Sequence, residues 1–427
     1  MPNRPKIKKK PTPFYYGWVI VAVSALTLLV AFGTRLSFTV FFVALTAEFG
    51  WARADTALIF SVSMIVFAIT SIAAGLALDR WGVRVVFAVG AGFLALGLFM
   101  SSQIDSLWQL AFTYGVVVGL GITILGLGLQ AGMLANWFRK RLGLAIGIAF
   151  AGTGLGTLLL TPYIEFLISN TGWQTAYQML AALALLLIPI ILIFMRRSPA
   201  VMGLYVDGIR PLPSASLHQN SPLTTNWTIK TASHTLSFWL VIVAALFAIG
   251  PLRMLTVHQL AVMVDAGFNS LYAATVIGGA GLVTAIAFIL FGTLSDRIGR
   301  RQTYVIGSIC LVGAIVVLSQ LQTPPQPGWL LVYGVLLGLG EGSRSSLVTA
   351  VASDLFPGQS LGAINGAVGS AFGAGAAFFP WLAGWIFDVN GDYNRAFLIA
   401  GLAIGVSTLA LWMAPVIAER RERSRSL

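Results

Sequence analysis

Apolar stretches of about twenty residues recur along the whole chain, and each is long enough to cross the roughly 30 Å hydrocarbon core of a membrane as a helix. We predict spans at residues 16–44, 56–78, 85–103, 108–136, 142–168, 173–195, 237–265, 271–293, 303–321, 329–353, 360–387 and 394–416. Transmembrane β-strands would instead alternate apolar and polar residues, and the chain has no such pattern. The sequence therefore predicts an all-α polytopic membrane protein with twelve transmembrane helices.

The composition excludes soluble alternatives. Hydrophobic residues make up 57% of the chain and charged residues 9%, whereas soluble domains carry about 25% charged residues. The net charge of +12 would suit nucleic-acid binding only on a soluble domain with a basic face, so we expect no nucleic-acid partner. The single cysteine, Cys310, lies inside an apolar stretch, which excludes a disulfide-stapled secreted domain.

The basic residues predict the orientation of the chain. With the N-terminus inside, 21 of the 26 Lys and Arg fall in cytoplasmic loops and tails, and only Arg53 and Arg395 fall outside. Cytoplasmic loops of membrane proteins are enriched in Lys and Arg. We therefore predict a multi-pass protein of the plasma or bacterial inner membrane, with both termini cytoplasmic and an uncleaved first span.

A polar, Pro- and Ser-rich segment at residues 196–236 follows the sixth span. We predict that it is a cytoplasmic linker between an N-terminal six-helix bundle (1–195) and a C-terminal six-helix bundle with a basic tail (237–427). The two halves repeat each other, since residues 75–84 align with 292–301, residues 114–121 with 333–340, and Pro162 with Pro380. Parallel six-helix repeats are a transporter architecture.

The repeated motif G-x-x-x-D-R-x-G-x-[KR] at residues 75–84 and 292–301 resembles the signature of the major facilitator superfamily. Residues 137–152 (WFRKRLGLAIGIAFAG) are similar to a signature of its monocarboxylate transporter branch. Gly17-Trp18 and residues 39–42 (TVFF) fit the same branch and its bacterial oxalate/formate antiporter relatives. The resemblance implies two pseudo-symmetric six-helix bundles, rocker-switch alternating access, and a central cavity lined by spans 1, 4, 7 and 10.

Span 8 departs from this branch. Animal members carry an Asp and an Arg there that are implicated in proton and carboxylate handling, whereas residues 270–293 contain no charged residue. If this chain handles carboxylates, another span must supply the cation.

Four charged residues lie within the predicted spans: Arg35 in span 1, Arg253 in span 7, and Glu341 and Arg344 in span 10. A charged residue at the membrane centre costs about 2.5–3.5 kcal/mol even on a lenient scale, and usually faces a cavity or the bundle interior. All four fall on spans that the resemblance assigns to the cavity, and their net charge of +2 favours an anionic substrate. The alternatives are snorkelling for Arg35 and a structural i,i+3 ion pair for Glu341 and Arg344.

Span 7 also carries His258 and Asp265. Arg253 and His258 are about 140° apart on an ideal helix, so both face the cavity only if Pro251 distorts the helix. His258 shares a helix face with Asp265, and a histidine beside a carboxylate would titrate near neutral pH and suit proton coupling. The alternative is a histidine that is simply hydrogen-bonded in place.

The remaining candidates concern gating and helix packing. Charged residues of the repeated motif lie at cytoplasmic helix ends, where they either form a gating latch or only set the topology: Asp79, Arg80, Arg84, Asp296, Arg297 and Arg301. Glycine rows at residues 143–156 and 362–373 predict close helix packing. The chain has no phosphate-binding loop, so we expect no cofactor and no ATP-driven step, and we expect no metal.

Together these features predict a secondary active transporter, not an enzyme, that moves a small organic anion, foremost a monocarboxylate. Its substrate-binding candidates are Arg35, Arg344, Arg253 and His258, and its coupling or gating candidates are Glu341, Asp265 and the motif residues. Proton symport, dicarboxylate exchange and export of amphiphilic compounds remain open. We expect the protein to function as a monomer in the lipid bilayer.

Overall fold

The computed structural model describes residues 15–208, 227–321, 326–356 and 361–425, and every regular element within them is a helix. Eleven of the predicted spans correspond to helices or helix runs that are long and apolar enough to cross a membrane. The tenth is divided at Ser343 into α14 (Pro327–Gly342) and α15 (Arg344–Leu355). The predicted all-α polytopic fold is confirmed, although several helices extend a few residues beyond the predicted ends.

The helices of the first half match the first six predicted spans. The first span is α1 (Gly17–Leu36) with α2 (Phe38–Phe49), the second is α3 (Arg53–Trp81), and the third is α4 (Val83–Ser101). The fourth is a run of α5 (Leu107–Leu110), π-helical η1 (Ala111–Val118), α6 (Gly119–Ile124) and α7 (Leu127–Ala135). The fifth is α8 (Leu142–Thr171) and the sixth is α9 (Trp173–Phe194). Those of the second half are α11 (Leu236–Asp265), α12 (Ser270–Ile298), α13 (Arg300–Ser319), α14, α15, α16 (Leu361–Asn390) and α17 (Asn394–Arg425).

The predicted linker is described only in part. It contains the short helices η2 (Pro199–Met202), η3 (Val206–Gly208) and α10 (Ile229–Ser233), while residues 209–226 lie outside the described residues. The predicted boundaries at 195 and 237 therefore stay predictions. The basic residues at positions 4–10 and 210, which we predict to be cytoplasmic, also lie outside the described residues.

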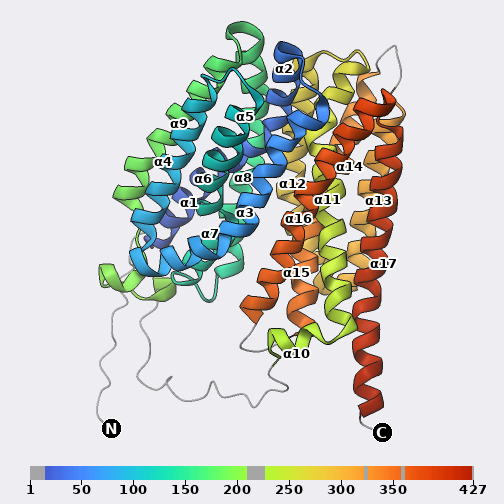
Figure 1. Cartoon of the computed structure of the whole chain (residues 1–427). Helices are drawn as coiled ribbons and strands as arrows, with labels where there is room; N and C mark the ends of the chain where they lie inside the picture. Colours follow the sequence, from blue (N-terminus) through green and yellow to red (C-terminus); the bar gives the residue numbers. More distant parts are fainter. Residues whose placement is uncertain (1–14, 209–226, 322–325, 357–360, 426–427) are drawn as a thin grey trace, which may run out of the picture.

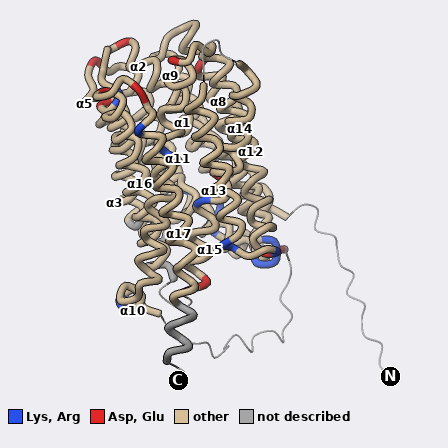
Figure 2. Tube along the Cα trace, turned by 90° about the vertical axis from the view of Figure 1, so that its right-hand side faces the viewer, with Lys and Arg blue, Asp and Glu red and all other residues tan. Residues whose placement is uncertain are grey.

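The two halves form two bundles that lie side by side (Figure 1). Three helix pairs form the interface between the halves, with α8 packed against α12, α3 against α16 and α2 against α11. We call the end that holds the start of α1 and the end of α17 the terminal end, and the opposite end the far end. Acidic residues gather mainly at the far end and basic residues mainly toward the terminal end (Figure 2), and the orientation in a membrane stays a prediction.

Glycines explain two features of this arrangement. Gly82 and Gly299 occupy equivalent turns of the repeated motif with φ of +81° and +92°, a region that side chains other than glycine rarely adopt. Gly154 of α8 faces Gly281 of α12 so closely that a Cβ on Gly154 would lie 2.3 Å from the Gly281 carbonyl oxygen. The close packing predicted for this part of span 5 therefore joins the two bundles.

Candidate functional site

A cavity lies between the two bundles. Residues of α1, α7 and α8 line it from the first half, and residues of α11, α12, α14 and α15 line it from the second. Its volume is about 100 Å³, which is small beside the ~300–1,000 Å³ of typical small-molecule pockets. Most of the wall is apolar, and its uncharged polar residues are Thr153, Thr157, Thr256, Gln259, Thr284 and Ser345.

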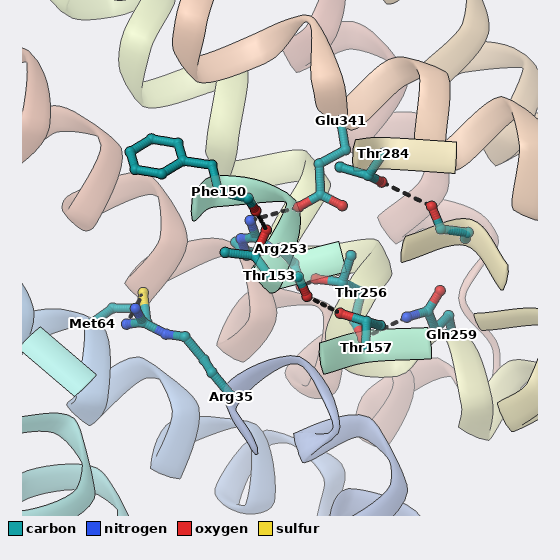
Figure 3. A network of polar contacts seen from close by, with 11 residues as sticks. Arg35, Met64, Phe150, Thr153, Thr157, Arg253, Thr256, Gln259, Thr284 and Glu341 are labelled. Atoms are coloured by element: carbon teal, nitrogen blue, oxygen red, sulfur yellow. Dashed lines mark hydrogen bonds and ion pairs between the residues drawn. The ribbon is translucent and has the colours of Figure 1, made fainter. Parts of the chain in front are cut away.

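An ion pair between Arg253 of α11 and Glu341 of α14 forms the charged part of the wall (Figure 3). Arg253 Nη2 donates to Glu341 Oε1 at 2.8 Å, and the two side chains are 19% and 15% exposed. The other terminal nitrogen, Arg253 Nη1, is buried and has no hydrogen-bond partner. An unmade hydrogen bond of a buried donor costs about 1–3 kcal/mol, so this guanidinium has a donor left for a ligand.

A helix irregularity lies beside each member of this pair. Pro251 lies inside α11, where it removes one backbone donor two residues before Arg253. On the other side, α14 ends at Gly342, immediately after Glu341, and α15 starts again at Arg344.

The cavity threonines present oxygen lone pairs. The hydroxyls of Thr153, Thr157, Thr256 and Thr284 each donate to a carbonyl three or four residues earlier in the same helix, at 2.8, 3.1, 3.4 and 2.9 Å. Each hydroxyl proton is thereby used, and the oxygen remains an acceptor. Gln259 is fixed differently, since its Oε1 accepts from the Tyr333 hydroxyl at 2.8 Å and its Nε2 donates to the Thr256 carbonyl at 3.1 Å.

Arg35 lies close to this site but does not line the cavity. Its side chain is buried, Nη2 contacts Met64 Sδ at 3.2 Å, and its guanidinium lies over the Phe67 ring at 5.5 Å. Phe32 and Leu36, its neighbours on α1, do line the cavity. No ion pair of Arg35 occurs within the described residues, so this cation is held by sulfur and aromatic contacts.

Arg344 does not line the cavity either. It is fully buried, its guanidinium lies over the Tyr304 ring of α13 at 4.8 Å, and none of its three side-chain nitrogens has a hydrogen-bond partner. The alternative of a structural pair with Glu341 is wrong, because Glu341 pairs with Arg253 instead. The expected four-charge cluster is therefore divided, and only Arg253 and Glu341 line the cavity.

His258 is buried, and its hydrogen-bond partners differ from the predicted partner Asp265. Its Nδ1 lies 2.9 Å from the Tyr393 hydroxyl and its Nε2 lies 2.8 Å from the Pro380 carbonyl oxygen. Because a carbonyl can only accept, Nε2 carries the proton and Nδ1 accepts from the tyrosine. The expected pairing of His258 with Asp265 is wrong, because Asp265 pairs with Arg53.

Arg53, at the start of α3, connects the two halves at the far end. Its Nη1 and Nη2 reach the two carboxylate oxygens of Asp265 at 2.7 and 3.0 Å, and its guanidinium stacks over the Phe387 ring at 3.7 Å. Asp388 of α16 accepts the backbone N–H groups of Arg53 and Ala54 at 2.9 and 2.8 Å. A carboxylate of one half thus caps a helix N-terminus of the other half, which stabilises that end.

A hydrogen-bonded chain continues inward from this contact. Arg53 Nη1 donates to the Tyr393 hydroxyl at 3.0 Å, and that hydroxyl reaches His258. Burial raises the pKa of Tyr393, against the opposing effect of Arg53, so its proton stays available for donation. We call Arg53, Asp265, Asp388, Tyr393 and His258 the far-end latch.

The charged residues of the repeated motif lie at the terminal end. The side chain of Asp79 lies outside the described residues, while Arg80, Asp296 and Arg297 are exposed. Arg84 Nε donates to the Met195 carbonyl at 2.7 Å, which ties α4 to the end of α9. Arg301 lines a cleft with Arg300 and Asp354, and the latter two form an ion pair. The gating role of these residues stays a prediction.

The sequence reading missed the role of Arg53. One signal was present, since Arg53 is one of two basic residues on the predicted outer side of a chain that otherwise keeps them inside. Its partners lie 212 and 335 positions away in the sequence, so spacing alone identified none of them.

Two six-helix halves around a cavity that contains an ion pair define a membrane transporter fold, and comparisons with known proteins agree. The family model of the Major Facilitator Superfamily matches residues 23–319 and 254–427. The chain therefore belongs to the major facilitator superfamily.

Sequence similarity relates the chain to one branch of this superfamily. It is 28% identical over 405 residues to monocarboxylate transporter 11 of Homo sapiens, covering 91% of this chain and 81% of that protein. It is 26% identical over 434 residues to monocarboxylate transporter 12 of Rattus norvegicus, covering 96% and 87%. The predicted resemblance to the monocarboxylate transporter branch is confirmed.

A solved structure shares the fold. The inward-facing, unoccupied bacterial homologue of the human lysosomal transporter Spinster superposes with a TM-score of 0.64 at 16% identity, covering 96% of each chain.

Proposed function

We propose that this chain is a secondary active transporter of small carboxylates, foremost monocarboxylates, and that Arg253 binds the carboxylate. The observation that carries the proposal is the cavity-lining guanidinium with one nitrogen paired and one buried nitrogen unpaired. A guanidinium suits a carboxylate because it can donate two parallel hydrogen bonds. Arg35 is the next candidate, since its neighbours on α1 line the cavity.

Glu341 couples carboxylate binding to the uptake of a proton. A carboxylate that binds Arg253 displaces Glu341 or shares the guanidinium with it, and two carboxylates so close repel each other. Uptake of a proton by Glu341 removes that repulsion, so a monocarboxylate enters together with a proton. Alternating access completes the cycle, with the far-end latch closing the predicted outer side while the cavity opens toward the predicted cytoplasmic side.

Transport by purified protein in liposomes tests the proposal. We expect uptake of labelled lactate, pyruvate or formate that an inward proton gradient accelerates. Oxalate uptake driven by internal oxalate without a gradient would favour a dicarboxylate exchanger instead. Transport of none of these acids, with or without a gradient, would refute the proposal.

Variants of Arg253 test the site. Arg253→Gln removes the cation, so we expect it to abolish uptake, while Arg253→Lys keeps the charge but loses the two-pronged geometry and retains a fraction. The exposed far-end Arg395 provides the control, and Arg395→Gln should transport like the parent protein. Equal uptake by Arg253→Gln and the control would assign the carboxylate to another residue.

A further inference from the structure

The charged groups of the cavity wall sum to zero within the described residues. Arg253 and Glu341 are the two charged residues that line it, and they lie side by side at 2.8 Å. Neither Arg35 nor Arg344 contributes, since neither lines the cavity. A ligand with a single negative charge therefore leaves the site unbalanced unless Glu341 is protonated, whereas a ligand with both charges balances it directly.

From this pairing we propose that the preferred substrate is zwitterionic, a carboxylate that also carries an ammonium group, with an apolar side chain. Its carboxylate takes the place of Glu341 at Arg253, and its ammonium takes the place of Arg253 at Glu341. This inference rests on the proposed transport of carboxylates at Arg253 and specifies which carboxylates fit best.

The polar wall suits an ammonium group. Thr153, Thr157, Thr256 and Thr284 use their protons within their own helices and offer only oxygen acceptors to the cavity. An ammonium has three donors and no acceptor, so an acceptor-rich wall beside a carboxylate matches it. A second carboxylate would meet Glu341 and these lone pairs without a cation, which disfavours dicarboxylates.

The rest of the wall suits an apolar side chain. Phe32, Phe150 and Phe288 line the cavity from α1, α8 and α12, together with Ile249 and Leu252 of α11. The rings come from both halves, so a side chain between them would contact both bundles at once.

A matched ligand series tests the inference on the parent protein reconstituted in liposomes. We compare L-phenylalanine with 3-phenylpropanoate, which lacks the ammonium, with 2-phenylethylamine, which lacks the carboxylate, and with glycine, which lacks the side chain. We expect phenylalanine to bind at least about tenfold tighter than each of the others, as each loses one charge pair or the buried ring.

The proton dependence provides a second readout. The ammonium replaces the proton that a monocarboxylate needs at Glu341, so phenylalanine uptake should not respond to a proton gradient, while 3-phenylpropanoate uptake should increase with it. In Glu341→Gln we expect the preference for phenylalanine over 3-phenylpropanoate to disappear. Asp105→Asn, an exposed far-end change outside the cavity, should keep it.

The two proposals fail differently. Equal or tighter binding of 3-phenylpropanoate by the parent protein would overturn the zwitterion inference and leave carboxylate transport standing. Equal binding of 2-phenylethylamine would overturn it as well, because the carboxylate would then be dispensable. Lack of transport of every carboxylate, lactate and pyruvate included, would refute the proposed function itself.

Discussion

The far-end latch makes a quantitative prediction about which end of the cavity is closed. Asp265→Asn combined with Asp388→Ala removes both carboxylates that hold Arg53 and the start of α3. Both belong to the second half, while Arg53 belongs to the first. The double variant should therefore destabilise the state with a closed far end without touching the cavity ion pair.

The contacts set the magnitude. The ion pair of Asp265 and Arg53 is partly solvated, with side chains 46% and 16% exposed, so its contribution is about 0.5–1 kcal/mol. The helix cap from Asp388 contributes about 1 kcal/mol. Their sum, about 1.5–2 kcal/mol, corresponds to a roughly 10- to 30-fold shift of the equilibrium toward an open far end.

Cysteine labelling in detergent measures this shift independently of membrane orientation. Thr39→Cys in a Cys310→Ser background places a thiol at a buried position of α2 whose hydroxyl accepts from the Leu260 N–H of α11 at 3.4 Å. Maleimide should label it about 10 to 30 times faster in the double variant than in an Asp105→Asn control. Equal rates would show that the latch does not hold the far end closed.

Three further changes test individual contacts by thermal unfolding of the purified protein. Tyr393→Phe breaks the middle of the hydrogen-bonded chain and leaves the buried His258 Nδ1 without a partner, so we expect a loss of about 1–3 kcal/mol, and an unchanged melting temperature would contradict this. Gly156→Ala would place a Cβ 2.2 Å from a backbone oxygen of α1 and should destabilise the first bundle, whereas Gly147→Ala, with nothing within 4 Å, should not. Arg344→Met removes a buried charge with no hydrogen-bond partner, so we expect equal or higher stability, and a marked loss would contradict this.

The sequence predicted the helices well, because lengths of about twenty apolar residues permit few alternatives in a membrane. It also identified Arg253 and Glu341 as candidates, because charges inside a membrane are costly and rare. The tenth span was predicted as one helix. Its division at Ser343 falls within a polar, glycine-containing stretch at residues 340–346 (GEGSRSS), a local signal that the prediction of a single helix did not use.

Side-chain partners could not be predicted in the same way. Whether Glu341 reaches Arg344 or Arg253 depends on how the chain turns at Ser343 and on the rotation of α11, and both are set by packing between distant helices. The far-end latch is a stronger case, since its contacts join residues of opposite halves. Local spacing informs only contacts within one helix.

The cavity and the far-end latch are joined through one helix. α11 carries Arg253 in the cavity, His258 at the inner end of the hydrogen-bonded chain and Asp265 at its outer end. These residues extend over about 18 Å of helix, at 1.5 Å per residue. Pro251 removes a backbone hydrogen bond just before this segment, so the helix bends there more easily than beyond it. Because a ligand at Arg253 and the release of Arg53 at Asp265 act on the same rigid segment, we infer that occupancy of the cavity biases the far-end latch directly.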